Sequence, residues 1–270
     1  MKRPVNLPDS PSPQQPGVKG CISSYQEKLQ VWNPLSKKGL ALFYQIETGP
    51  GERVLQVIPD SCVDLVFHFG EHNGAMMRGP VQFQTATVLR PNTTYFYFKP
   101  YSLTSAKSLK IPFSDLSDTS VPFEMQFEDL SIIERMYSAA SFDERIALML
   151  DYARKYLVNR DYKPGLVEHL ELASCQARGS LKVEQITSNF GYTDRYCRGK
   201  FKEVHGISIK NYSDVMRFQN IVRMLSIPDN KMSSDVVFEN QLYDQSHLIH
   251  EFKKYTAFTP CEFKRAFCPA

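Results

Sequence analysis

The chain has 270 residues, 42% of them hydrophobic and 12% aromatic, which excludes a disordered or fibrous protein and predicts a globular one of about two domains. Its formal net charge of +3 is unevenly distributed. From Ser174 onward there are 14 Lys and Arg against 10 Asp and Glu, and before it 18 against 19. The basic excess therefore lies in the C-terminal part, as binding to phosphates would require.

Residues 1–20 are rich in Pro, Ser and Gln and poor in large apolar side chains, so we expect a disordered tail. Lys2 and Arg3 resemble the start of a signal peptide, but no apolar stretch of about 7–15 residues follows. No apolar run approaches the roughly 20 residues that span a bilayer. The sequence thus predicts a soluble cytoplasmic protein without membrane contact.

Six cysteines are spread along the chain without a C-x-x-C pair or a spacing that would gather four zinc ligands: Cys21, Cys62, Cys175, Cys197, Cys261 and Cys268. We expect reduced thiols, no metal site and no cofactor. Disulfides would be the alternative only in an oxidising compartment.

Residues 21–165 are expected to form a mainly β domain with trailing helices. Short apolar runs alternate there with turns rich in Gly, Pro, Asn and Asp, as in antiparallel hairpins. The predicted strands are Leu40–Ile46, Arg53–Ile58, Asp64–Phe69, Pro80–Leu89 and Tyr95–Phe98. The aromatic run in the last of these is more typical of ordinary core than of a ligand pocket, although both readings stay open.

After Ser120 the apolar period becomes helical. Ser141 to Glu144 has the Ser-x-x-Glu form of a capping box, in which side chains satisfy the free N–H groups of a first helical turn. One helix face is expected to carry Ile146, Met149, Leu150, Ala153 and Leu157. A further helix over Leu166–Leu172 begins the second predicted domain, residues 166–270.

Two stretches in that domain nearly repeat each other, with Phe201-Lys202 matching Phe252-Lys253 at a distance of 51 residues. Each copy has a short apolar helix, a tight turn, and a capping residue before a second helix: Thr193 in one, Asp244 in the other. This order predicts two helix-turn-helix units, whose second helix lies in the major groove of DNA.

An amphipathic stretch between the copies predicts a connecting helix through Tyr212, Val215, Met216, Val222 and Leu225. If that helix is rigid, the two units would enter successive major grooves about 34 Å apart. The overall fold class is therefore α+β, a mainly β N-terminal domain followed by an all-α C-terminal domain.

Residues from about Cys175 to Phe267 resemble the AraC/XylS family of transcription regulators. The resemblance lies in Asp244-Gln245-Ser246-His247, Phe252-Lys253-Lys254 and Thr259-Pro260-x-x-Phe263. A weaker resemblance links Ile58 to Phe67 and Phe98-Lys99-Pro100 with the sensor-type N-terminal domain of some relatives. The family implies two helix-turn-helix units on a long helix and an N-terminal domain that binds an effector or another subunit.

By position, the resemblance implies six base-reading residues: Arg195, Arg198, Gly199, Gln245, Ser246 and His250. Arginine donates two hydrogen bonds to guanine, so Arg195 and Arg198 are the foremost candidates, with a structural salt bridge as the alternative for each. Gly199 has no side chain for a base contact.

Six further residues are candidates for phosphate contacts, which give affinity and register: Thr193, Lys200, Lys202, His247, Lys253 and Lys254. A merely solvated helix face is the alternative for each lysine. His247 and His250 lack partners at metal-like spacing, so a DNA-facing or exposed role is expected for both.

Three positions depart from the family pattern. Gln241 stands where a turn glycine is usual, and Ala257 where glycine ends the recognition helix. A left-handed backbone there would cost about 1 kcal/mol in each case. Lys182 replaces the usual Ser or Thr cap.

These features predict a bacterial-type, sequence-specific DNA-binding transcription regulator, either activator or repressor. No hydrolase, phosphate-loop or metalloprotease motif occurs, so no enzymatic activity is expected. Double-stranded DNA is the main predicted partner, with RNA polymerase, a small-molecule effector and a second copy of the chain as further candidates. The alternative is a regulator that binds a protein partner and keeps the fold without reading DNA.

Overall fold

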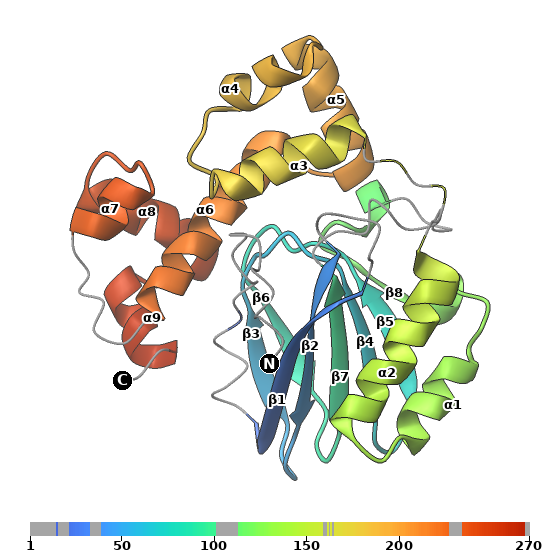
Figure 1. Cartoon of the computed structure of the whole chain (residues 1–270). Helices are drawn as coiled ribbons and strands as arrows, with labels where there is room; N and C mark the ends of the chain where they lie inside the picture. Colours follow the sequence, from blue (N-terminus) through green and yellow to red (C-terminus); the bar gives the residue numbers. More distant parts are fainter. Residues whose placement is uncertain are drawn as a thin grey trace, which may run out of the picture.

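The computed structural model describes residues 15, 22–32, 39–100, 113–158, 161, 163, 165–226 and 234–267. A β-rich part comes first and a helical part follows, so the predicted α+β fold class is confirmed (Figure 1). Nearly all of the expected tail, residues 1–20, lies outside the described residues. The predicted domain boundaries stay a prediction.

Eight described strands form two antiparallel sheets. The larger has the order β1-β2-β7-β4-β5-β8, and the smaller pairs β3 with β6. The strands are β1 (Ser24–Val31), β2 (Leu40–Glu47), β3 (Arg53–Val57), β4 (Asp64–Phe69), β5 (Gly74–Arg78), β6 (Thr85–Leu89), β7 (Thr94–Pro100) and β8 (Ser120–Pro122).

Alternation of side chains along β2 and β7 divides the β-rich part into two cores. Phe43, Phe96 and Phe98 point into one cluster, whereas Tyr44 and Tyr97 point into the other. The aromatic run of β7 is therefore divided between the two faces of the sheet. Its phenylalanines are core, and Tyr97 lines a cavity on the other face of the sheet.

The predicted strand over Pro80–Leu89 is too long, because β6 begins only at Thr85. Residues before it pair instead with the segment ahead of β8: Pro80 O accepts from Asp118 N at 3.0 Å, and Gly79 N donates to Thr119 O at 2.9 Å. A Cβ atom on Gly79 would lie 1.6 Å from Leu116 O, so only glycine fits this approach. Proline also lacks the N–H that a strand ladder needs.

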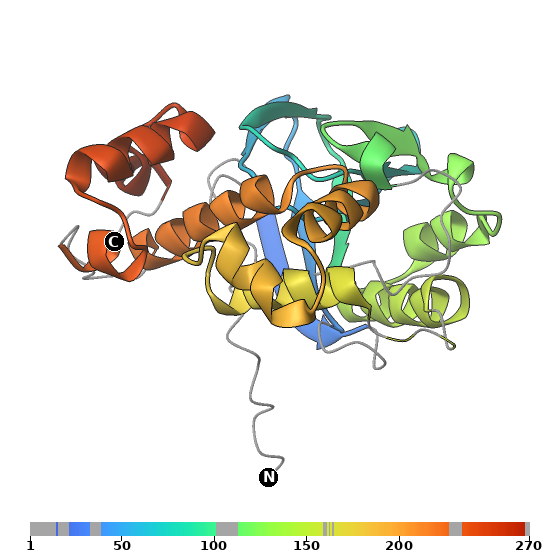
Figure 2. The same ribbon diagram turned by 90° about the horizontal axis from the view of Figure 1, so that it is seen from above.

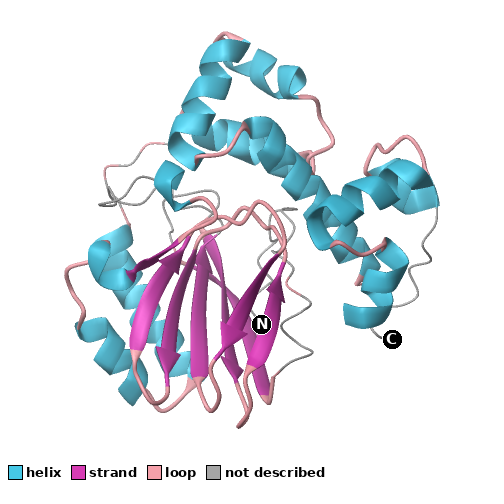
Figure 3. Ribbon diagram, turned by 180° about the vertical axis from the view of Figure 1, so that it is seen from behind, coloured by secondary structure: helices cyan, strands magenta, loops and turns pink. Residues whose placement is uncertain are grey.

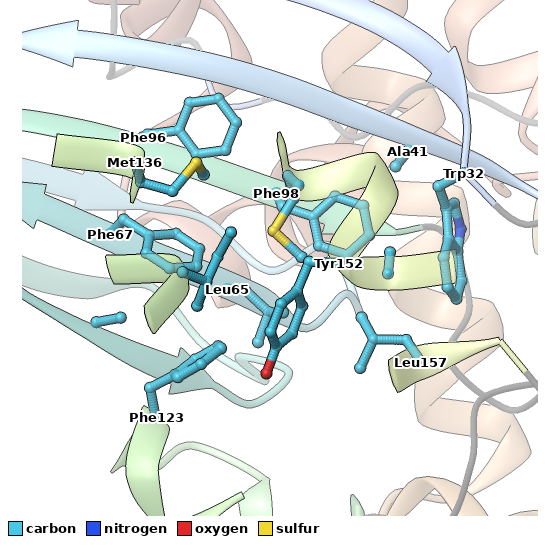
Figure 4. Close-up of a cluster of buried hydrophobic side chains, with 14 of the residues drawn as sticks. Trp32, Ala41, Leu65, Phe67, Phe96, Phe98, Phe123, Met136, Tyr152 and Leu157 are labelled. Atoms are coloured by element: carbon cyan, nitrogen blue, oxygen red, sulfur yellow. The ribbon is translucent and has the colours of Figure 1, made fainter. Parts of the chain in front are cut away.

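Helices α1 (Ser131–Ser138) and α2 (Phe142–Tyr152), followed by the π-helical turn η4 (Ala153–Leu157), cover one face of the larger sheet (Figure 1). Ser141 caps α2 as predicted, since its Oγ accepts from Glu144 N at 3.2 Å. Figure 4 shows Met136, Tyr152 and Leu157 from these helices facing aromatic side chains of the sheet. Burial of this shared face holds the helices in place.

The remaining helices form the second part. They are α3 (Leu166–Gln176), α4 (Val183–Thr187), the 3-10 turn η5 (Ser188–Phe190), α5 (Asp194–His205), α6 (Ile209–Leu225), α7 (Ser234–Glu239), α8 (Gln245–Thr256) and α9 (Pro260–Phe267). Short 3-10 turns, η2 (Phe113–Leu116) and η3 (Phe123–Met125), flank β8.

The predicted connecting helix is α6, which has 17 residues and is about 25 Å long by the usual helical rise. Tyr212, Val215 and Val222 are buried in the core that it shares with its neighbours. Figures 1 and 2 place α4 and α5 toward one end of α6 and α7 to α9 toward the other. One buried helix thus carries both predicted units.

The helical part lies across the loop end of the strands, as the view from behind shows (Figure 3). Ile58, which follows β3, packs within the core of the helical part. Gln219 of α6 donates from Nε2 to Pro59 O at 2.5 Å. Among the described residues, no helix combines the length and apolar character needed to cross a bilayer.

Candidate nucleic-acid interface

The first predicted unit consists of α4, η5 and α5, with a left-handed Gly191 (φ 69°) in the turn. Thr193 caps α5, because its hydroxyl accepts from Tyr196 N at 3.3 Å. Cys197 and Phe201 point into the core, and Gly206 (φ 73°) ends the helix. This is the predicted order of helix, turn and capped helix.

The side of α5 opposite the core is exposed. Arg195, Gly199 and Lys202 all lie there. Lys200 is half-buried and pairs with Glu203 at 2.7 Å. A Cβ atom on Gly199 would meet nothing within 4 Å, so the surface beside it is open. Of the predicted base readers in this unit, Arg195 is thus the freest to reach outward.

Arg198 is held within the unit. Its Nε donates to Asp194 Oδ2 at 2.5 Å, and its terminal nitrogen donates to Glu184 Oε1 of α4 at 2.6 Å. Asp194 also accepts from Thr187 Oγ1 at 2.8 Å. The hydrogen bond from Arg198 lowers the pKa of the Asp194 carboxyl, and that from Thr187 lowers it further. The structure therefore has the salt-bridge alternative for Arg198, which joins α4 to α5.

The second predicted unit consists of α7 and α8. Asp244 caps α8 by accepting from His247 N at 2.7 Å. Gln241 (φ 52°) and Ala257 (φ 59°) are both left-handed, so each side chain stands in a backbone region that favours glycine. Leu248, Phe252 and Tyr255 point into the core as predicted.

The opposite side of α8 is also exposed. All six residues predicted for DNA contact in this unit are exposed: Gln245, Ser246, His247, His250, Lys253 and Lys254. Tyr243 N donates to His247 Nδ1 at 3.3 Å, and the His247 side chain is exposed. Lys254 Nζ lies 4.9 Å from the ring centre of Tyr255.

Helix α9 follows with a complete capping box. Thr259 N donates to Glu262 Oε2 at 2.7 Å, and Glu262 N donates to Thr259 Oγ1 at 3.2 Å. The backbone hydrogen bond from Thr259 N lowers the pKa of Glu262, and the Thr259 hydroxyl lowers it further. Phe263 packs edge-on against Phe252 with ring centres 5.2 Å apart, so α9 braces α8.

The cap of α4 is incomplete, as the Lys182 departure indicates. Lys182 provides no side-chain acceptor for the first turn. Gln185 compensates in part, because its Oε1 accepts from Lys182 N at 2.9 Å. Leu181 lies before the start of this helix and is half-exposed.

Two exposed tyrosines were missed from the sequence. Tyr192 and Tyr243 each stand immediately before the capping residue of a second helix, at equivalent positions of the two copies. They are 55% and 95% exposed, and Tyr192 stacks on Tyr196 with ring centres 5.2 Å apart. The shared Tyr-cap pair was the signal that would have revealed them. Both lie beside the predicted DNA-facing side.

The rest of the site shows no sign of a metal centre. No group of three or more His, Cys, Asp or Glu side chains in the described part of the chain is arranged to hold a metal ion. None of the described cysteines, Cys62, Cys175, Cys197 and Cys261, forms a disulfide.

Comparison with known proteins gives structural matches alone. No protein-family model and no curated protein matches this sequence. The apo K231A variant of ToxT from Vibrio cholerae strain SCE256 matches with a TM-score of 0.46 and 10% identity, over 92% of this chain and 99% of that one. Wild-type ToxT of the same strain with a bound unsaturated fatty acid gives 0.44 and 9%, over 91% and 96%.

Proposed function

We propose that the chain is a sequence-specific DNA-binding transcription regulator. The observation that carries this proposal is the pair of capped helices α5 and α8, each after a short helix and a turn, and both packed on the single helix α6. Their apolar sides are buried, and their outer sides present cationic and hydrogen-bonding side chains. That is the arrangement with which helix-turn-helix proteins enter successive major grooves.

Within this proposal, Arg195 reads bases and Arg198 positions α5 against α4. The exposed side of α8 reads bases through Gln245, Ser246 and His250. Tyr192 and Tyr243 flank the two second helices and contact the sugar-phosphate backbone. Lysines 200, 202, 253 and 254, with Thr193 and His247, bind phosphates and fix the register.

The test is genome-wide binding of the tagged protein, followed by titration of the enriched DNA and a scrambled duplex. We expect the enriched sequence to bind about a thousandfold or more tighter, with affinity that falls steeply as salt rises because counterions are released. Arg195→Ala should cost about 1–3 kcal/mol of discrimination at one base pair.

Arg154→Ala is the matched control, because it removes the same charge from the exposed turn η4 of the β-rich part. It should leave both affinity and sequence preference unchanged. Equal binding of enriched and scrambled DNA by the wild-type protein would overturn the proposal.

A cavity of about 200 Å³ in the β-rich part supports a response to a small effector. It lies between the two sheets, with Leu55 and Val57 of β3 on one wall and Tyr44 and Tyr97 of the larger sheet on the other. The Tyr97 hydroxyl is buried and has no hydrogen-bond partner in the described structure. A ligand with a polar group would satisfy it.

This part of the proposal is tested by thermal unfolding in the presence of small polar compounds, since a ligand that binds only the folded state raises Tm. Val57→Trp should fill the cavity and abolish the shift. Val54→Trp is the matched control, because Val54 lies on the same strand and is half-exposed on the other face. Equal shifts in both variants would place the ligand elsewhere.

Binding of a protein partner is the second candidate function, favoured by large apolar side chains on the surface of the second unit. Phe238 is 83% exposed and Tyr243 95% exposed. Such residues are enriched where proteins meet. The test is whether the tagged protein retains RNA polymerase or a second copy of the chain. Retention that is lost on Phe238→Ser and is unaffected by DNA would support this function over the first.

A further inference from the structure

The segment from Ile58 to Cys62, between β3 and β4, contacts the cavity on one side. Asp60 Oδ2 accepts from Lys99 Nζ at 2.6 Å, and both side chains are almost fully buried. Asp64 of β4 lies 2.8 Å from the same ammonium group. Burial alone would lower the pKa of Lys99, but Asp60 and then Asp64 raise it, so the ammonium stays charged inside the cavity wall.

The same segment contacts the helical part on its other side. Gln219 of α6 donates to Pro59 O at 2.5 Å, and the Gln219 side chain is 1% exposed. Ile58 is packed in the core that also contains Phe218 and Val222 of α6. Two neighbouring residues of the segment thus make the two contacts. Pro59 accepts the hydrogen bond from Gln219 of α6, and Asp60 accepts the hydrogen bond from Lys99 in the cavity wall.

The segment is tightly fixed by hydrogen bonds to one carboxylate. Asp60 Oδ1 accepts from Cys62 N at 3.0 Å, across the left-handed Ser61 (φ 55°). Gln15 Nε2 donates both to Asp60 Oδ2 at 2.9 Å and to Ile58 O at 2.7 Å. The turn from Ile58 to Cys62 is therefore rigid, and a group that draws Lys99 away from Asp60 acts directly on it.

We propose that this segment couples the cavity to α6. A ligand whose oxygen acceptor takes over the Lys99 ammonium weakens its bond to Asp60, and the turn then loosens its contact with Gln219. Since α6 carries both helix-turn-helix units, their placement changes with the occupancy of the cavity. The inference rests on the proposed function of the cavity as an effector site, and it identifies the route by which the effector acts.

The coupling is testable without the ligand, through the amide hydrogen exchange of the full-length protein. Asp60→Asn removes the charge that holds Lys99 on the segment. We expect exchange of peptides covering residues 209–225 to become about five- to tenfold faster, as the loss of one hydrogen-bonded contact implies. Peptides of α2, on the far face of the sheet, should keep their wild-type rates.

Asp64→Asn is the matched control. It removes the other carboxylate from the same ammonium group but lies on β4, outside the segment. We expect it to leave α6 within about twofold of wild-type exchange, a spread typical of surface and uncoupled changes. Equal acceleration of α6 in both variants would show that the effect is a general loss of stability and would overturn the coupling.

A reciprocal variant keeps the test decisive if Asp60→Asn fails to fold. Gln219→Leu removes the donor from α6 at nearly constant volume, and coupling requires that exchange of residues 55–63 then accelerates. In the double variant the two effects should not multiply. Multiplication of the two effects, or unchanged exchange at 55–63 in Gln219→Leu, would overturn the proposal.

The outcome for DNA binding is separate. If exchange shows the coupling while the wild-type protein does not discriminate between DNA sequences, the proposed function fails and the coupling stands. If the protein discriminates between DNA sequences while the exchange effects multiply, the proposed function stands and the coupling fails.

Discussion

The two helix-turn-helix units have the same order of elements but are held together by different chemistry. In the first, Arg198 joins α4 to α5 through ion pairs at the surface. In the second, Asn240 at the end of α7 is buried and bonded to Asn220 of α6, which donates from Nδ2 to Asn240 Oδ1 at 2.8 Å. Asn240 Nδ2 in turn donates to Val236 O at 2.8 Å.

The units also differ where their second helices end. Gly206 ends α5 in the left-handed region without cost, whereas Ala257 ends α8 there with a Cβ atom. The second unit is compensated by a buried amide pair and by packing of α9 on α8. The comparison teaches that a repeated fold does not require repeated interactions. Burial of Phe201 against α6 holds the first unit in place, and burial of Phe252 against α6 holds the second.

The largest expected effect is loss of that shared burial. Phe201→Ala and Phe252→Ala should each destabilise the helical part by about 3–5 kcal/mol, since both rings are fully buried. Urea unfolding followed by circular dichroism measures this. Leu181→Ala, at a half-exposed position, is the control. A loss below about 1 kcal/mol for either phenylalanine, the average for any mutation, would contradict the common dependence on α6.

The next effect distinguishes the buried amide pair of the second unit from the surface ion pairs of the first. Asn240→Ala should cost about 1–3 kcal/mol, because it leaves the buried amide of Asn220 without that partner. Arg198→Ala should cost at most about 1 kcal/mol, since its side chain is 37% exposed and solvent screens the pairs. Chemical denaturation of both variants tests the ranking. An arginine effect equal to or larger than the asparagine effect would break the comparison.

Substitutions at the helix ends should have opposite signs. Ala257→Gly should stabilise the protein, and Gly206→Ala should destabilise it, each by about 1 kcal/mol, because only glycine adopts a left-handed backbone without strain. Thermal unfolding of the two variants gives the difference. If Ala257→Gly lowered Tm, the left-handed backbone at that position would not be the source of strain.

The smallest expected effect is on the loss of stability in acid. The pKa values of Asp194 in the first unit and Glu262 beside the second are both depressed, below their usual 3.8 and 4.5. Their stabilising contributions are complete above those values and are lost as pH falls through the lower folded values. Asp194→Asn and Glu262→Gln should each flatten the fall of stability below about pH 4.

Denaturation at several pH values between neutrality and acid measures this slope. Asp151→Asn, at an exposed surface pair of the β-rich part, is the control. A slope unchanged in Asp194→Asn would mean that the bond from Arg198 does not favour the charged carboxylate.

Much of the local structure was predictable. The N-terminal caps Ser141, Thr193 and Asp244 were found from sequence, because capping depends on a side chain and an N–H group within one turn. Strand β5 was missed because its Met76-Met77-Arg78 lacks the branched and aromatic residues typical of strands. The edge strands were also missed, β1 because most of its residues are polar and β8 because it has only three residues and ends in proline.

The candidate interface was predictable in outline. The repeat placed Arg195, Gln245 and His250 on outer helix faces, and the structure has them exposed. Whether Arg198 reads bases or forms a salt bridge was left open by the sequence. Asp194 lies four residues before it, but Glu184 approaches Arg198 only because the turn brings α4 against α5. No pattern in the sequence indicates the hydrogen bond between Gln219 and Pro59, which are 160 residues apart.

By itself the sequence determined the periods of its strands and helices, the caps of its helices and the presence of two similar units, because these depend on residues within about one or two turns of each other. Only the tertiary structure decided which charged groups are paired, where the cavity lies and how the turn at Asp60 meets α6. Those features depend on the approach of segments distant in the chain, which burial of apolar surface brings together without regard to their spacing in sequence.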